Sequence, residues 1–203
     1  MLSRWVRKWV GALLNPFLVV LARCGIGPDA VTMGSLAVVL LSGTLIALGY
    51  TVSGGLVLLL GGILDGLDGA LARQQQSASP FGAFLDSIAD HCGDFAVYFG
   101  LLCLLLHDGG RRTETLLLFA ALFGSLFGSQ IRSRAGMLGM DLKDVGFFTR
   151  FERVLVLVLG LMSGRITESL WVLALGTNLS ALQRLHHALR AWRSLQSGRT
   201  PLT

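Results

Sequence analysis

The chain has 203 residues, of which 53% are hydrophobic and only 14% are charged. Soluble domains carry about 25% charged residues, so this composition excludes an ordinary soluble domain and a disordered chain. Three cysteines, an odd number in apolar surroundings, give no support for a secreted disulfide scaffold. We therefore expect an all-α polytopic membrane protein in which residues 1–203 form a single domain.

The N-terminal segment 1–22 combines tryptophans with basic residues. Trp5 and Trp9 share one face of a helix, and Arg4, Arg7 and Lys8 flank that face. This pattern is typical of an amphipathic helix that lies in the membrane interface. A cleaved signal peptide is the alternative, although no small-residue cleavage site follows an apolar core. The sequence thus predicts an N-terminal interfacial helix.

Six apolar segments follow, each a candidate for a transmembrane helix, which needs about 20 residues to cross a bilayer. The predicted spans are 31–50, 53–72, 81–106, 113–135, 150–164 and 167–189. Their short connections favour one six-helix bundle over 30–190, followed by a cytosolic tail over 191–203. In the fourth span, Gly124 and Gly128 form a small-xxx-small surface that favours close helix association.

The basic residues are distributed unequally between the two sides of the membrane. With a cytosolic N-terminus, fourteen of the seventeen lysines and arginines lie at or near the cytosolic side, and Arg111, Arg112 and Arg165 lie outside. This bias predicts cytosolic termini in an integral protein of the cytoplasmic membrane. The net charge of +5 suits anionic membrane lipids or a phosphorylated substrate, because no nucleic-acid-binding motif accompanies it.

Acidic residues gather where the second and third spans meet. Asp65 and Asp68 are three residues apart and share a helical face, while Asp86, Asp90 and Asp94 follow at intervals of four. A carboxylate in a membrane helix costs about 2.5–3.5 kcal/mol on insertion scales. Their convergence favours a site for Mg²⁺ or Mn²⁺, and four carboxylates suit two ions. Protonated acids in a polar cavity, or acids that reach the interface, are the alternative.

The residues around these acids indicate space for a substrate. Gly69 and Ala72 remove side-chain bulk from the acidic face, and Gly82 leaves the start of the next helix open. Arg73 ends the second span with a guanidinium suited to phosphate. A phosphate or a flat ring could therefore approach the carboxylates closely.

The string formed by these residues resembles the signature of the CDP-alcohol phosphotransferase family, D-x2-D-G-x2-A-R-x8-G-x3-D-x3-D. It matches at every specified position, which are Asp65, Asp68, Gly69, Ala72, Arg73, Gly82, Asp86 and Asp90. The family moves a phosphatidyl or similar group from a CDP-linked donor to an alcohol and releases CMP. The resemblance thus implies a phosphatidyltransferase that uses CDP-diacylglycerol, and it suggests a homodimer.

The same resemblance implies roles for individual residues. Asp65, Asp68 and Asp86 would bind the metals, and Asp90 would help to bind them and act as general base. The CDP site would include Asp68, Gly69, Ala72, Arg73 and Gly82. Upstream, Pro28-Asp29-Ala-Val-Thr32 is similar to the family's Pro-Asn-x-x-Thr, which adds Asp29 and Thr32 to the donor site. The alternative is that Pro28 and Asp29 simply start and cap a helix. Asp94, outside the signature, is expected to be a hydrogen-bonded interior carboxylate or to tune the metal site.

Cytosolic arginines bear on the identity of the alcohol. The region 129–153 is similar to that of phosphatidylinositol-phosphate synthases, and it makes Arg132, Arg134 and Arg153 candidates for binding an acceptor phosphate. Arg193, beyond that region, is a further candidate. Because a second phosphate needs compensating cations, inositol phosphate is the expected acceptor and glycerol 3-phosphate the alternative. Membrane anchoring, or pairing with Glu152 and Asp144, would also account for the arginines.

Two other classes of function fit the carboxylates less well. A cation channel or transporter would need polar residues across the whole bilayer, which the first, fourth and fifth spans lack at depth. An inactive scaffold would have no reason to retain all four signature aspartates.

Overall fold

The computed structural model describes residues 26–75, 77, 79–107, 109, 111–142 and 145–196, with side chains up to residue 193. The predicted interfacial helix over 1–22 lies outside these residues. Over the described residues the chain forms six α-helices and no strand. The helices are α2 (Pro28–Ala47), α3 (Thr51–Gln74), α4 (Pro80–His107), α5 (Arg112–Met137), α6 (Arg150–Ser163) and α7 (Ile166–Gln196).

Local sequence signals explain where the first helix begins and ends. Pro28 occupies the first position of α2 after the N-cap Gly27, where its missing N–H costs no hydrogen bond. The helix stops at Ala47 because Gly49 adopts a φ of +86°, a left-handed conformation that suits a residue without a side chain. Compared with the predicted 31–50, α2 begins and ends three residues earlier.

The last helix is longer than predicted. Helix α7 runs to Gln196 rather than to residue 189, so part of the segment expected as a tail is helical. The apolar pattern ends near residue 189, but residues 190–196 contain neither glycine nor proline to break a helix. A loss of hydrophobicity therefore marks where the chain leaves an apolar environment, not where the helix ends.

Four of the described helices, α2 to α5, are long and apolar enough to cross a membrane, so the chain is an integral membrane protein. Helix α6 has 14 residues. At a rise of 1.5 Å per residue it extends about 21 Å, which is less than a bilayer core of about 30 Å. The six-span arrangement therefore stays a prediction for α6 and α7.

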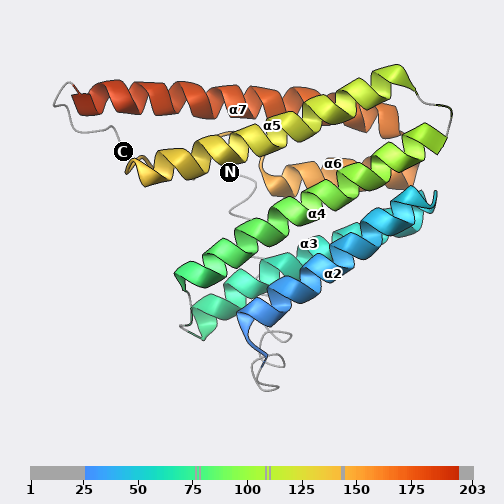
Figure 1. The fold of residues 1–203 in the computed structure, drawn as a ribbon, viewed down its shortest axis with the longest axis horizontal. Helices are drawn as coiled ribbons and strands as arrows, with labels where there is room; N and C mark the ends of the chain where they lie inside the picture. Colours follow the sequence, from blue (N-terminus) through green and yellow to red (C-terminus); the bar gives the residue numbers. More distant parts are fainter. Residues whose placement is uncertain are drawn as a thin grey trace.

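The helices form two halves joined by α6. Helices α2, α3 and α4 pack together in the first half, and α5 packs along α7 in the second, as Figure 1 shows. Helix α6 contacts both α3 and α7, and α4 also contacts α5. Successive helices alternate in direction, so the last turns of α3, α5 and α7 lie toward the end where α2 and α4 begin.

Each half contains a close helix crossing that requires glycine. In the first half, a Cβ atom on Gly100 of α4 would lie 2.2 Å from the carbonyl oxygen of Gly43 in α2. In the second half, a Cβ atom on Gly124 would lie 2.4 Å from the hydroxyl of Thr177, and Gly128 also faces α7. The predicted close helix association at the small-xxx-small surface of α5 is thus confirmed, and the partner helix is α7 of the same chain.

Candidate metal and substrate site

Three of the predicted metal ligands meet between α3 and α4. One carboxylate oxygen from each of Asp65, Asp68 and Asp86 lies within 4.8 Å of the others. The short connection between the helices makes them antiparallel, which brings the end of α3 beside the start of α4. Oxygen ligands bind Mg²⁺ at about 2.1 Å, so two ligands of one ion lie up to about 4 Å apart. Small movements of these hard oxygen ligands would let them share a divalent ion.

Asp68 is the most tightly held of the three. Its side chain is buried, with the residue only 7% exposed. The Thr32 hydroxyl of α2 donates to Asp68 Oδ2 over 2.6 Å, and the Gly69 backbone N–H donates to Oδ1. Thr32, predicted to belong to the donor site, therefore contacts a predicted metal ligand and orients its carboxylate.

Asp90 lies one helical turn beyond Asp86 and contacts a residue that the sequence had not singled out. The guanidinium of Arg150, the first residue of α6, forms an ion pair with Asp90. Arg150 Nη1 also lies 2.5 Å from Asp65 Oδ2. Among the described residues, Asp90 is therefore joined to the three-carboxylate cluster through Arg150 and Asp65.

A second ion pair lies one turn deeper along the same two helices. Arg153 Nη2 lies 3.2 Å from Asp94 Oδ2, and the Ser125 hydroxyl donates to the same oxygen over 3.0 Å. This geometry confirms that Asp94 is a hydrogen-bonded interior carboxylate. The guanidinium of Arg153 is engaged here, so its expected contact with an acceptor phosphate stays a prediction.

The start of α6 determines where both arginines point. Thr149 and Glu152 form a capping box, in which each side chain binds the other residue's backbone N–H. Arg150 and Arg153 are three residues apart and share a helical face, which meets Asp90 and Asp94 on α4. Glu152 serves the cap and forms no ion pair with an arginine among the described residues, which does not support the alternative in which it pairs with the candidate arginines. Asp144 lies outside the described residues.

The residues predicted to bind the CDP group lie beside the carboxylates. A Cβ atom on Gly69 would lie 3.5 Å from a guanidinium nitrogen of Arg73, and one on Gly82 would lie 3.3 Å from Asp29 Oδ1. Asp29 lies in the first turn of α2, after the N-cap Gly27. The alternative in which Pro28 starts the helix and Asp29 caps it is therefore right about Pro28 and wrong about Asp29, because the N-cap is Gly27. Ala72 is half-buried in the last turns of α3.

The predicted acceptor arginines are more widely spread. Arg132 and Arg134 are exposed near the end of α5, and Arg193 is exposed near the end of α7. Only Arg132 is close enough to a predicted metal ligand, Asp86, to interact with it electrostatically. The described contacts do not bring Arg134 or Arg193 to the carboxylates.

Arg184 of α7 is a further basic residue that the sequence reasoning did not select. It is only 9% exposed, and its guanidinium donates to the carbonyl oxygens of Val145 and Gly128, each over 3.0 Å. Electrostatic interactions couple it to Arg132 and Arg153. An arginine about three turns before the end of a largely apolar helix was the available signal. We call Arg132, Arg153 and Arg184 the basic region.

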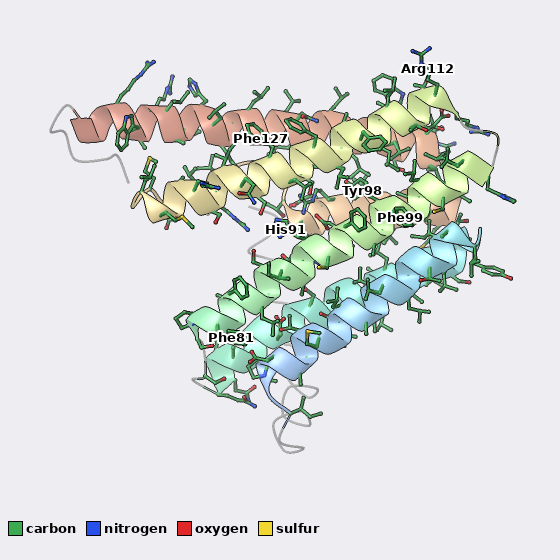
Figure 2. The ribbon with its side chains drawn as sticks, in the orientation of Figure 1. Phe81, His91, Tyr98, Phe99, Arg112 and Phe127 are labelled. Atoms are coloured by element: carbon green, nitrogen blue, oxygen red, sulfur yellow. The ribbon has the colours of Figure 1, made fainter. Side chains whose placement is uncertain are left out.

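His91 and Cys92 face away from the carboxylates, as their helix positions predict. They line an apolar groove of about 650 Å³ between α2 and α4, together with Phe95 and Phe99. Figure 2 shows His91 and Phe99 along α4, with Phe81 near the beginning of that helix. Neither His91 nor Cys92 is part of the carboxylate cluster among the described residues.

Comparison with known proteins identifies the class of this molecule. Residues 26–125 match the family model for CDP-alcohol phosphatidyltransferases. The chain is 31% identical to a phosphatidylinositol phosphate synthase of Mycobacteroides abscessus, covering 89% of this chain and 85% of the relative. It is 30% identical to an archaetidylinositol phosphate synthase of Pyrococcus horikoshii, with 93% and 96% covered. The chain belongs to the CDP-alcohol phosphatidyltransferase family and is an enzyme rather than a channel.

Two crystal structures of a related protein extend this comparison to three dimensions. Phosphatidylinositol phosphate synthase (PgsA1) of Mycobacterium tuberculosis with CDP-DAG bound superposes with a TM-score of 0.80 at 28% identity, covering 87% of this chain and 94% of that one. Its complex with manganese and citrate gives a TM-score of 0.78 at 29% identity, with 86% and 88% covered. A metal-bound member of the family therefore shares this fold, and the carboxylate cluster described above provides suitable metal ligands.

Proposed function

We propose that this protein transfers the phosphatidyl group of CDP-diacylglycerol to inositol phosphate and releases CMP. The observation that carries the proposal is the meeting of Asp65, Asp68 and Asp86 at a site that Arg132 of the basic region approaches. Carboxylates suit metal ions that bind a pyrophosphate, and arginines suit a second phosphate. Two relatives, a phosphatidylinositol phosphate synthase and an archaetidylinositol phosphate synthase, support inositol phosphate as the acceptor.

Two divalent ions, Mg²⁺ or Mn²⁺, would complete the site. Asp65, Asp68 and Asp86 are the ligands proposed for the first ion, and Asp90 would join Asp65 or Asp86 around the second. When bound, the ions would neutralise charge on the pyrophosphate oxygens as CMP departs. Thr32 contributes by holding Asp68 in a fixed orientation.

The reaction itself requires one bond to form and one to break at the same phosphorus. The acceptor hydroxyl oxygen bonds to the phosphorus that carries diacylglycerol, and the bond from that phosphorus to the bridging oxygen of CMP breaks. CMP leaves with the electron pair. Asp90 accepts the hydroxyl proton, a role that typically contributes a factor of about 10²–10⁴ to the rate.

The donor would bind across the ends of α3 and α4. Gly69, Ala72 and Gly82 leave space for the cytidine and pyrophosphate, and Arg73 offers a cation to a phosphate. Asp29 lies next to Gly82 and would contact the same group. The diacylglycerol chains would remain in the surrounding lipid.

The acceptor phosphate would bind on the side of α5, α6 and α7. Arg132 and Arg153 are the proposed ligands that belong to the basic region, and Arg184 supports them from α7. Arg134 and Arg193 lie farther out and would attract the anion toward the site. Arg153 would also have to share its guanidinium between Asp94 and the phosphate.

We further propose that this site faces the cytosol and that the protein is a homodimer with six spans per chain. The excess of basic residues at one side of the predicted spans supports the orientation. Labelling of single introduced cysteines in sealed vesicles tests the orientation, and mass measurement in detergent tests the dimer.

The proposed activity is tested by one transfer assay with the full chain in liposomes. CDP-diacylglycerol and Mg²⁺ are offered with inositol phosphate, glycerol 3-phosphate, inositol or serine in parallel reactions. CMP release and a lipid product are expected with inositol phosphate. A faster reaction with glycerol 3-phosphate would instead identify a phosphatidylglycerophosphate synthase, and absence of CMP release with every acceptor would overturn the proposal.

A further inference from the structure

The guanidinium of Arg150 lies among the proposed metal ligands. It forms ion pairs with Asp65 and Asp90, which belong to different helices. Among the described residues, no other lysine or arginine forms an ion pair with Asp65, Asp68, Asp86 or Asp90. A single side chain from α6 thus forms ion pairs with two of the four proposed ligands.

The contacts divide the carboxylates into two groups. Asp65, Asp68 and Asp86 each place a carboxylate oxygen within 4.8 Å of the others, an arrangement suited to one ion, and neither Asp68 nor Asp86 is ion-paired with Arg150 among the described residues. Asp90, by contrast, lies outside that cluster, and its ion pair is with Arg150. A second ion that uses Asp90 would need the oxygens that the guanidinium now contacts.

Arg150 is held mainly by these two carboxylates. Its Nε atom is buried without a hydrogen-bond partner, and one oxygen of Asp90 also lacks a well-directed hydrogen bond. A guanidinium with an unsatisfied buried donor loses little hydrogen bonding when it turns toward another anion, because that donor gains a partner. The phosphate of a bound substrate is such an anion.

We propose that Arg150 is a positioning residue that competes with the second metal ion for Asp65 and Asp90. It keeps these carboxylates together before metal binds, and it leaves Asp90 when the second ion and a phosphate arrive. The first ion binds at Asp65, Asp68 and Asp86, whereas the second binds more weakly until Arg150 moves. This inference rests on the metal site of the proposed function.

The experiment counts Mn²⁺ ions bound to the full chain in detergent, without substrates, from the electron paramagnetic resonance signal of free Mn²⁺. The wild type is expected to bind one ion and then a second at least tenfold more weakly. Arg150→Gln removes the competing cation, so the second ion is expected to bind about tenfold more tightly. Arg150→Lys keeps a cation and is expected to restore the difference between the two affinities.

Arg153→Gln is the matched control, because Arg153 lies on the same face of α6 but pairs with Asp94 outside the cluster. It is expected to leave both Mn²⁺ affinities at their wild-type values. If the wild type binds two Mn²⁺ ions with equal affinity, the proposed role of Arg150 is overturned while the metal site stands, whether or not Arg150→Gln folds. The role is also overturned if the second Mn²⁺ affinity is unchanged in Arg150→Gln, or if Arg150→Lys binds the second ion as tightly as Arg150→Gln does. Absence of any Mn²⁺ binding to the wild type would overturn the metal site and this inference together.

Discussion

The two halves of the molecule have similar architecture and opposite charge. Each is made of antiparallel helices and contains a close glycine crossing. In the described part of 26–107, the acidic residues are six aspartates and the only lysine or arginine is Arg73. In the described part of 111–196 there are ten arginines. The charge of the first half therefore suits cations, and that of the second half suits anions.

Among the described residues, the ion pairs between the halves come from the first turn of α6, and Ser125 of α5 adds a hydrogen bond to Asp94. Arg150 and Arg153 reach across to Asp65, Asp90 and Asp94 of the first half. A pyrophosphate that carries metal ions suits one side of this junction, and a phosphorylated alcohol suits the other. We therefore expect substitutions in the first half to alter donor recognition and substitutions in the second half to alter acceptor recognition.

The largest effect is expected from the first half. Asp68→Asn or Asp90→Asn should lower CMP release by at least about 10³-fold, because each removes a proposed metal ligand and Asp90 is also the proposed general base. Glu168→Gln, which changes an exposed carboxylate in the first turn of α7, is the matched control and should keep wild-type activity. The assay is CMP release in liposomes, with thermal unfolding to verify folding. Full activity of either aspartate variant would contradict the proposed site.

A substitution in the second half should separate the two substrates. Arg153→Ala is expected to raise the KM for the phosphorylated acceptor about tenfold or more, since a charge-assisted contact to phosphate is lost, while the donor KM changes little. Initial rates at varied concentrations of each substrate give both constants. Asp94→Asn breaks the same ion pair but keeps the arginine, so it should raise the acceptor KM much less. Equal increases in both KM values would show that Arg153 only supports the fold.

An intermediate effect is expected where α2 supports a metal ligand. Thr32→Val removes the hydroxyl that donates to Asp68, and loss of such a supporting hydrogen bond typically weakens metal binding about 10- to 100-fold. Thr44→Val is the control on the same helix, because the Thr44 hydroxyl donates to the backbone carbonyl of Leu40, within α2, and not to a predicted metal ligand. Mn²⁺ titration checks both variants. Unchanged affinity in Thr32→Val would remove Thr32 from the site.

The smallest effects concern packing, in which the halves should behave alike. Gly100→Ala places a methyl group against the backbone of Gly43, and Gly124→Ala places one against Thr177. Each should reduce the free energy of unfolding by about 1–3 kcal/mol. Gly34→Ala, in α2, meets nothing within 4 Å and should be neutral or slightly stabilising. Thermal unfolding in detergent measures all three, and a stable Gly100→Ala protein would contradict the close crossing.

The carboxylate cluster was predictable because its geometry follows from spacing. Asp65 and Asp68 share a helical face by their interval of three, and the short connection to α4 brings Asp86 beside them. The predicted span 150–164 also begins at the residue where α6 begins, Arg150. These features depend on interactions within one helix or between helices adjacent in the chain.

Contacts between distant helices were not predictable in the same way. Arg150 reaches Asp65 only because α6 packs on α3, and 85 residues separate the two side chains in the sequence. Gly124 and Gly128 gave a correct signal for close packing, but spacing alone does not say whether the partner is α7 or a second chain. The polar end of α7 was predicted as tail because hydropathy reports the environment of a helix, not its continuity.

The capping box at the start of α6 has a consequence for how such enzymes change during evolution. An α-helix turns about 100° per residue, so one residue inserted between Thr149 and Arg153 would rotate Arg153 away from Asp94. The connection between α5 and α6 ends just before the cap, and its length does not affect the direction of either arginine. Insertions and deletions before Thr149 should therefore be tolerated among relatives, whereas the five residues from Thr149 to Arg153 should keep a constant length.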